Sequence, residues 1–538
     1  MEGAVGTDVI REKGYLEHYQ RLYYMQSQLA IRNKAPFRFR NTIPLLGPLA
    51  AVAIAITSVL IRSPFLQLPL TSDEGAYAYI AYFWAKGGNL YDDTLLIFRP
   101  QAIIAIYRVA MDILGTDVHG IRLFAGIYNG FTIIFVYLTA RRVLNTGYSL
   151  LAAFFFAFFS VSILIEGFTA NGELFLNLPA TVSAFLLLSA GKSKSQLAWY
   201  FAAGLAAGIA TQIKPSGLAS LILGIMYASY LASKRENRPV LPWLIRTYTG
   251  LLVGFAVSLL PALAHGWFIG WDRYVYAAIG FSLSHSSPIS YPLSYHLWRM
   301  LVSFLNVMKD CSILLLAAVV RLVLLSLRRF SEPELFLWFW LFSAGLGIAA
   351  GGSWWLHYYI QGLPPACIIA ATSISIALEQ GKWHRTRFAI ASALIIIFTI
   401  TLVAWIPILF HNTEEIQQKI WAINTNTWAP QVSEYIAERT SPDDRIFVMN
   451  SDPEIYFLTR RKPAYPYLFF SPTELPRVPE APQELATVIK DPSKAPVYMV
   501  LPGDRSYGIG LEPVYEALDK YYVLDATFGP IQLYRYEK

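Results

Sequence analysis

Two adjacent carboxylates, Asp73 and Glu74, follow the first long apolar stretch of the chain. A carboxylate at a membrane surface can take the proton of an attacking hydroxyl group and so act as a general base. The same pair would also suit the first turn of an amphipathic helix, with Ser72 or Asp73 as N-cap and the helix dipole stabilising the negative charge. The spacing of these residues is compatible with both roles.

Further ionisable residues stand where apolar stretches begin or end. Glu173 opens one stretch, with Glu166 seven residues before it. Lys214 separates two other stretches, and Arg99 precedes Pro100 and Gln101. A cation at such a position could neutralise a phosphate, and a guanidinium could do so with two hydrogen bonds. The simpler alternatives are a capping glutamate and cations that extend toward the lipid headgroups.

Residues 351–359 form an aromatic cluster that contains His357 and Tyr358. Such a cluster is typical of the aromatic belt at a membrane interface, although its histidine could also bind a ligand. The other histidines of the outer loops stand at scattered positions, and zinc, Ser-His-Asp and phosphate-loop motifs are absent from the sequence. We therefore predict no particular metal ligands and no assured cofactor, while a bound divalent metal stays compatible with the carboxylates.

The composition indicates a membrane protein. The chain has 538 residues, of which 55% are hydrophobic and only 15% charged, and its mean hydropathy is +0.42. About 25% of the residues of a soluble domain are charged, so soluble multidomain enzymes and disordered proteins are excluded. The net charge of +7 does not indicate nucleic-acid binding, because residues 43–410, the most apolar region, are also the most basic, with 23 basic and 14 acidic residues.

Eleven apolar stretches are long enough to cross the ~30 Å hydrocarbon layer of a membrane. They lie near residues 43–61, 119–140, 148–165, 173–190, 197–213, 216–233, 243–262, 311–327, 335–352, 358–378 and 388–410. Alternate loops are basic, for example at Arg141-Arg142 and Lys234-Arg235, and the basic N-terminal tail lies on their side. By the positive-inside rule we expect the N-terminus in the cytoplasm and the C-terminal segment outside the cell membrane.

The polar ends and the apolar middle predict three parts. Residues 1–42 are expected to form a cytoplasmic or interfacial tail, residues 43–410 a helical membrane domain, and residues 411–538 an extracytoplasmic domain. The outer loop of residues 62–119 is amphipathic, which predicts interfacial helices. Strand-like runs alternate with helical stretches in the last part, near 445–450, 497–501, 521–525 and 531–536. The predicted fold class is therefore an all-α polytopic membrane protein with a small C-terminal α/β domain.

In their order and sidedness these features resemble the GT-C integral-membrane glycosyltransferases. The closest likeness is to the family 39-type group, which contains the protein O-mannosyltransferases and the aminoarabinose transferases of lipid A. It covers residues 43–410 and, more loosely, the tail. The motifs that carry it are Asp73-Glu74-Gly75-x-Tyr77, Gly88-Asn89-Leu90-Tyr91, Ile121-Arg122-Leu123, Asn171-Gly172-Glu173-Leu174-Phe175, the run from Ala203 to Gly208 with Lys214, and His357-Tyr358-Tyr359-Ile360-Gln361.

The resemblance implies an enzyme that transfers a hexosyl or pentosyl group with inversion on the extracytoplasmic face. The donor would be a polyprenyl-phosphate sugar and the acceptor a protein, lipid or glycan. Asp73 matches the acid of the first outer loop, and Arg99 stands where the family has a lysine that meets the lipid phosphate. The residues implied for catalysis are Asp73, Glu74 and Glu173, and those implied for binding the donor are Arg99, Lys214, Tyr77, His357 and Tyr358.

Two other functions fit a polytopic chain. A transporter or a flippase for lipids or lipid-linked sugars would need ionisable residues at mid-membrane depth or interrupted helices, whereas most charges here cluster at the outer rim. An assembly subunit without catalytic activity would retain the fold but lose the chemical groups. The presence of Asp73, Glu173 and Lys214 argues against it.

Overall fold

The computed structural model describes residues 45–91, 100–190, 195–235, 239–280, 292–324, 330–380, 427–450, 452–471, 478–505 and 510–537, with short pieces between 389 and 416 and at residue 475. The predicted tail of residues 1–42, the candidate Arg99 and about half of the predicted span 388–410 lie outside the described residues.

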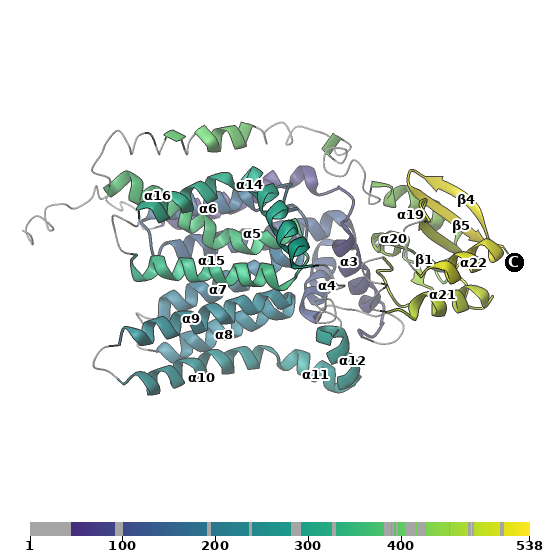
Figure 1. Cartoon of the computed structure of the whole chain (residues 1–538), viewed down its shortest axis with the longest axis horizontal. Helices are drawn as coiled ribbons and strands as arrows, with labels where there is room; N and C mark the ends of the chain where they lie inside the picture. Colours follow the sequence, from purple (N-terminus) through teal and green to yellow (C-terminus); the bar gives the residue numbers. More distant parts are fainter. Residues whose placement is uncertain are drawn as a thin grey trace, which may run out of the picture.

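Long apolar helices run side by side and form one end of the molecule (Figure 1). Within the described residues, eight helical segments are long and apolar enough to cross a membrane. They are built from α2 (Leu46–Ile61), α5 (Val118–Ala140), α7 (Gly172–Ala190), α9 (Ala219–Ser233), α10 (Val240–Ser258), α14 (Leu293–Leu324), α15 (Glu332–Ala350) and α16 (Leu363–Gln380), some extended by short helical turns. Large apolar side chains such as Leu46, Leu49 and Leu60 of α2 are exposed, as lipid-facing side chains must be. The chain is therefore an integral membrane protein.

Three predicted spans take a different form in the structure. The stretch 148–165 contains a shorter apolar helix, α6 (Thr146–Phe159), and 197–213 is α8 (Gln196–Ile213), which is not among the eight candidate spans. The stretch 311–327 is the second half of α14, which begins at Leu293 and bends at Cys311, where φ is −97° and ψ is 15°. The sequence predicted residues 311–327 as a span of its own, but in the structure it continues from the residues before it in one bent helix.

Glycines allow α8 and α10 to approach each other closely. A Cβ atom on Gly204 would lie 2.0 Å from the carbonyl oxygen of Leu251, and one on Gly254 would lie 2.0 Å from that of Phe201. Each helix therefore presents a small-xxx-small pattern to the other, Gly204 with Gly208 and Gly250 with Gly254. Lys214 follows α8 directly, so this crossing fixes the end of the helix from which it projects.

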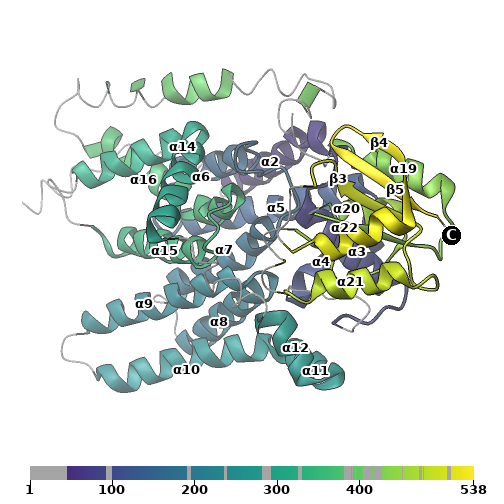
Figure 2. The same cartoon turned by 45° about the vertical axis from the view of Figure 1, so that its right-hand side comes forward.

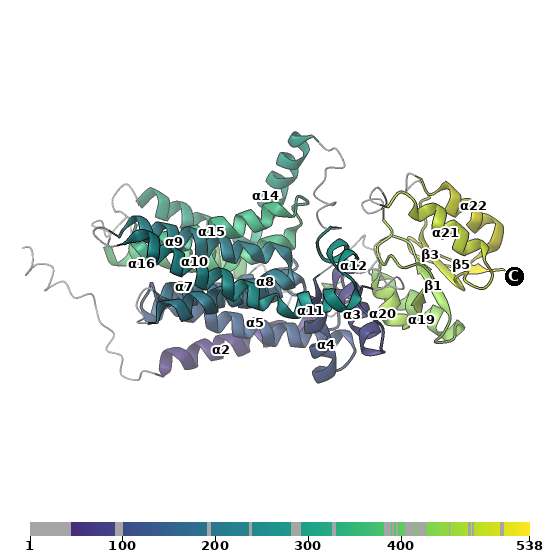
Figure 3. The same ribbon diagram turned by 90° about the horizontal axis from the view of Figure 1, so that it is seen from below.

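Two helices of the segment between α2 and α5 lie between the bundle and the C-terminal domain (Figures 1 and 3). These are α3 (Ser72–Ala85) and α4 (Gln101–Leu114). Thr71 is the N-cap of α3: its hydroxyl oxygen accepts from the Glu74 backbone N–H, and the Glu74 carboxylate accepts from the Thr71 backbone N–H, which completes a capping box. The capping role considered for this motif is thus present, although Thr71 rather than Ser72 or Asp73 is the cap.

The C-terminal domain is a five-stranded sheet in the order β2-β1-β3-β5-β4. The strands are β1 (Arg445–Val448), β2 (Lys462–Pro463), β3 (Tyr498–Pro502), β4 (Tyr522–Phe528) and β5 (Ile531–Tyr536), with β1 parallel to β2 and β3 and β5 antiparallel to β3 and β4. Helices α21 (Ala481–Lys490) and α22 (Glu512–Tyr521) cover one face, and α19 (Ala429–Arg439) and α20 (Glu454–Thr459) the other (Figure 3). The predicted fold class, a helical membrane protein with a C-terminal α/β domain, is confirmed.

The C-terminal domain packs directly on α3. Ile446 and Val448 of β1 belong to the same hydrophobic core as Tyr77 and Tyr79 of α3. Figure 2 shows α20 beside α3, and a Cβ atom on Gly75 would lie 2.5 Å from the Glu454 backbone. The hydroxyl of Tyr79 donates a hydrogen bond of 3.0 Å to the carbonyl of Arg461. The C-terminal domain therefore holds α3, whose first turn contains Asp73 and Glu74.

Candidate active site

Glu74 and Arg122 form a fully buried ion pair at the end of the helix bundle that faces the C-terminal domain. The Nε and Nη2 atoms of Arg122 donate to the two carboxylate oxygens of Glu74 at 3.1 and 2.8 Å. The remaining donors of Arg122 bond the backbone carbonyls of Phe65, Leu68 and Pro69 at 2.7–2.8 Å. All five N–H groups of the guanidinium are thereby satisfied. Arg122 thereby holds the segment between α2 and α3 against the start of α5.

The Glu74 carboxylate also accepts hydrogen bonds from backbone groups of two separate segments. The N–H of Ala170 donates at 2.8 Å and that of Thr71 at 2.9 Å. Burial alone would raise the pKa of the Glu74 carboxyl, but the Arg122 charge and these hydrogen bonds outweigh burial and hold the pKa below its usual value. Glu74 is therefore a buried, ionised and fully bonded carboxylate.

Asp73, one position earlier on α3, is half-buried rather than buried. Its charge acts on the ammonium group of Lys214, as does the hydroxyl of Tyr77. Tyr77 is 3% exposed and packs edge-on against Tyr107, with ring centres 5.5 Å apart. The first turn of α3 therefore faces the turn that carries Lys214.

Lys214 pairs with the buried carboxylate of Glu173, which is the second residue of α7. Glu173 has a side chain only 1% exposed, whereas that of Lys214 is 19% exposed. The aliphatic part of Lys214 lies on Gly172, where a Cβ atom would be 3.5 Å from its Cδ. The ammonium group lies 4.2 Å from the ring centre of Tyr358. Lys214 is thus a cation held between an acid and an aromatic face, with part of its surface open.

His357 stands between two carboxylates. Its Nδ1 atom lies 3.1 Å from an oxygen of Glu166, and its Nε2 atom lies 3.9 Å from an oxygen of Glu173. The short helix η5 (Leu356–Gly362) that carries His357 is tied to α7 by Asn177, whose amide donates to the carbonyl of Ile360 at 2.9 Å. Glu166 comes from the loop between α6 and α7.

Arg62 and Tyr107 anchor this loop, which spans residues 160–171. The guanidinium of Arg62 donates to the carbonyls of Ser160 and Gly167 at 2.6 and 2.9 Å. The hydroxyl of Tyr107 donates to the carbonyl of Ala170 at 2.8 Å. The loop is therefore fixed by two long side chains from α2 and α4 as well as by Glu74.

The structure brings together most of the residues predicted for the site. Those that interact with or act on one another around Lys214 are Asp73, Tyr77, Glu173, His357 and Tyr358. Glu74 lies beneath them in the Arg122 pair. Arg99 lies outside the described residues, but the flanking Gln101 is bonded to His265 at 2.8 Å, and the ring of Tyr91 lies 5.6 Å from the same imidazole.

Sequence reasoning gave no role to Arg122 and did not predict Glu166 as a site residue. The signal for Arg122 was available, because an arginine in the first turns of a long apolar stretch needs a buried acidic partner. Its partner is 48 residues away in the chain. No local pattern pairs Glu166 with His357, which is 191 residues away.

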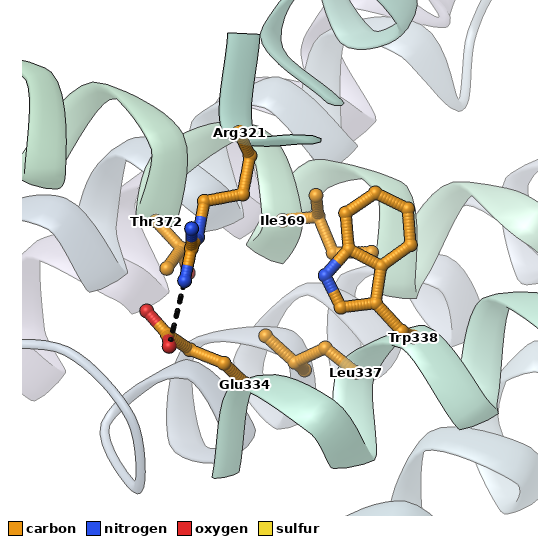
Figure 4. Close-up of a pocket in the computed structure, with 6 residues that line it drawn as sticks. All are labelled: Arg321, Glu334, Leu337, Trp338, Ile369 and Thr372. Atoms are coloured by element: carbon orange, nitrogen blue, oxygen red, sulfur yellow. Dashed lines mark hydrogen bonds and ion pairs between the residues drawn. The ribbon is translucent and has the colours of Figure 1, made fainter. Parts of the chain in front are cut away.

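Another buried ion pair lies far from this site. Arg321 of α14 and Glu334 of α15 are 3.0 Å apart and line a small pocket with Trp338 and Thr372 (Figure 4). Glu334 stands near the start of α15, whose other end leads to residues 351–357, so roughly 25 Å of helix separates the two places. Within the described residues, no cluster of three or more acidic, histidine or cysteine side chains is arranged to hold a metal.

Residues 99–261, which include Glu173 and Lys214, match the family model of the dolichyl-phosphate-mannose-protein mannosyltransferases. No curated protein sequence matches the chain. Two solved structures show the similarity of the whole fold. ArnT from Cupriavidus metallidurans, bound to undecaprenyl phosphate, is 14% identical with a TM-score of 0.59, and the alignment covers 91% of this chain and 98% of ArnT.

The second is the archaeal oligosaccharyltransferase AglB from Archaeoglobus fulgidus, in complex with an inhibitory peptide and a dolichol-phosphate. It is 12% identical with a TM-score of 0.54, and the alignment covers 91% of this chain and 74% of AglB. Both are glycosyltransferases of the GT-C class. The protein therefore has the GT-C fold, and the predicted resemblance to this class is confirmed.

Proposed function

We propose that the protein transfers a sugar from a polyprenyl-phosphate donor to a protein, lipid or glycan acceptor, with inversion, at the outer face of the membrane. The observation that carries this proposal is the Lys214–Glu173 ion pair, with the half-buried Asp73 close enough for its charge to act on Lys214. An acid and a partly exposed cation are the two groups that displacement at a sugar phosphate requires. The lipid phosphates bound by ArnT and AglB support the donor class.

In the proposed reaction the acceptor atom attacks the anomeric carbon as the bond from that carbon to the phosphate oxygen breaks. Asp73 takes the acceptor proton, and the polyprenyl phosphate leaves with the bonding electron pair. Lys214 neutralises the leaving phosphate, and Arg99 is proposed as a second cation for it. Tyr358 and Tyr77 would line the donor site.

The proposed roles of the three acids differ because their surroundings differ. Glu74 uses its oxygens on Arg122 and on backbone N–H groups, so we assign it to positioning Asp73 rather than to proton transfer. Glu173 is buried against Lys214 and would orient the ammonium group. Asp73 is the acid that is not fully buried, which suits a group that must meet an acceptor.

The test is transfer by the purified full-length chain in proteoliposomes that contain undecaprenyl-phosphate sugars. We expect Asp73→Asn to lower the transfer rate by roughly 10²–10⁴-fold, the usual contribution of a general base. Asp112→Asn, at an exposed carboxylate on α4, is the matched control and should transfer at the parental rate. Full activity of Asp73→Asn would contradict the proposed role. Movement of a labelled solute or lipid without any glycosylated product would favour the transporter or flippase function.

A further inference from the structure

Four ionisable side chains form a continuous row beside the donor site. In order they are Glu166, His357, Glu173 and Lys214, and successive members lie 3.1 Å apart, then 3.9 Å apart, and finally in direct ion-pair contact. With a protonated imidazole the charges alternate in sign along the row. The row begins in the loop of residues 160–171 and ends at the partly exposed ammonium group of Lys214.

A phosphate that binds Lys214 would disturb the alternation of charges along this row. Lys214 is the direct ionic partner of Glu173, whose side chain is only 1% exposed. A phosphate at Lys214 draws the ammonium group away from that carboxylate. A buried carboxylate without a cation is strongly unfavourable, so another positive charge must approach Glu173 for the phosphate to bind well.

His357 is placed to supply that charge. Its Nε2 atom lies 3.9 Å from the Glu173 oxygen, just beyond hydrogen-bond distance, while Glu166 holds the other ring nitrogen. Glu166 has a φ of 54°, in the left-handed region that a glutamate seldom adopts. Two groups of Thr169 bond its carbonyl, at 2.6 and 3.0 Å, and maintain this conformation. The loop therefore stores backbone strain at the residue that orients the imidazole.

We infer that His357 is a positioning residue: when the donor phosphate binds Lys214, the protonated imidazole of His357 balances the negative charge of Glu173. This inference rests on the proposed function, and it makes donor binding dependent on the imidazolium form of His357. The proton comes from water, and no covalent bond changes. Within the described residues, the charged groups that act on the imidazole are Glu166, Glu173 and Lys214, and the ring of Tyr358 packs against it. From α14, Asp310 reaches the same loop through a hydrogen bond from Ser162.

The experiment measures the affinity of the full chain for undecaprenyl phosphate in zwitterionic nanodiscs between pH 5.5 and 8.5. The pKa of a free imidazole is about 6.5. We expect the affinity to fall by ~10-fold or more as pH rises through the titration of His357. In His357→Gln the binding of undecaprenyl phosphate should be weak at every pH. The only pH dependence of the affinity that remains should come from the titration of the phosphate itself. Glu166→Gln should move the loss of affinity to lower pH, because the imidazolium loses a carboxylate partner. His119→Gln, at an exposed histidine, is the control and should match the parent.

Glu173→Gln separates this role from direct contact between His357 and the phosphate. Without the Glu173 charge, no buried negative charge needs a cation. The affinity for undecaprenyl phosphate should then no longer depend on the protonation of His357, and it should remain high at high pH. A parental pH dependence in Glu173→Gln, or in His357→Gln, would overturn the inference. If undecaprenyl phosphate does not bind the parent at any pH, the proposed function fails instead, so the two failures are distinguishable.

Discussion

At the scale of single residues, neighbours along the chain have opposite surroundings. Glu74 is completely buried, whereas Asp73 is half-buried and acts on Lys214. The helix geometry explains the difference, because consecutive residues of a helix point about 100° apart. A pair of adjacent acids thus supplies one group for structure and one group available for chemistry.

Glu74→Gln should destabilise the protein strongly. Removal of one partner of a buried ion pair leaves the other charge uncompensated, which costs about 3–5 kcal/mol. The measurement is thermal or denaturant unfolding of the detergent-solubilised chain. Arg108→Gln is the matched control, because the Arg108–Asp112 pair is solvent-exposed, with side chains 32% and 57% accessible, and exposed pairs contribute about 0–1 kcal/mol. Equal losses in the two variants would show that the Glu74 pair is not important for stability.

The same carboxylate predicts how stability depends on pH. The pKa of Glu74 is lower in the folded protein than in the unfolded chain, because Arg122 and backbone N–H groups outweigh the effect of burial. Its contribution is therefore fully present above the unfolded pKa of about 4.3 and is lost as pH falls from there through the folded pKa. Unfolding temperatures measured from pH 7 to pH 3 should fall less steeply for Glu74→Gln than for the parent. Parallel curves would contradict this assignment.

At the scale of secondary-structure elements, the crossing of α8 and α10 determines where Lys214 lies. Its glycines allow direct contact between backbones. Gly254→Ala would place a methyl group 2.0 Å from the carbonyl oxygen of Phe201, so the helices must separate, at a cost of about 1–3 kcal/mol or more.

The control for this variant is Gly345→Ala on α15, where a Cβ atom meets no other atom within 4 Å. It should be neutral or slightly stabilising, because alanine favours helix more than glycine does. The two variants are compared by thermal unfolding and by transfer rate. Retention of full stability and activity in Gly254→Ala would mean that the crossing can relax without displacing Lys214.

The sequence predicted the positions of helices and strands along the chain better than the tertiary contacts between them. Apolar length located α2, α5 and α7, and the strand-like run predicted at residues 531–536 has the same bounds as β5 (Ile531–Tyr536). Length alone could not show that α14 extends back to Leu293, because the charged residues Lys309 and Asp310 interrupt the apolar stretch although the helix does not end there. The meeting of Glu166 with His357 depends on tertiary packing, and no short-range pattern encodes it.

At the scale of the whole molecule, α3 is shared between two parts of the fold. Its first turn is bonded to the membrane bundle through Arg122, and its next turns pack on α20 of the C-terminal domain. A displacement of the domain would therefore move Asp73. This arrangement predicts that a substitution at the contact between α3 and the C-terminal domain lowers activity.

Gly75→Ala is the variant that tests this coupling. A Cβ atom there would lie 2.5 Å from the Glu454 backbone, so α3 and α20 must move apart. We expect the transfer rate to fall at least ~10-fold, since misplacement of a catalytic group by about 1 Å can cost roughly 10²-fold. Helical content by circular dichroism should stay at the parental value. An unchanged rate, with Gly345→Ala as reference, would show that Asp73 is positioned independently of the C-terminal domain.

The shared core also decides how the protein can be divided. Ile455 and Tyr456 of α20 and Tyr79 of α3 are each no more than 4% exposed, and the rings of Tyr79 and Tyr456 lie 5.6 Å apart. Removal of the C-terminal domain would expose this apolar face of α3 to water, and the isolated domain would expose the matching face of α20. We therefore expect that neither part folds stably when it is expressed alone. A hybrid that carries the C-terminal domain of a relative must also carry that relative's residues on the face of α3 that packs on α20.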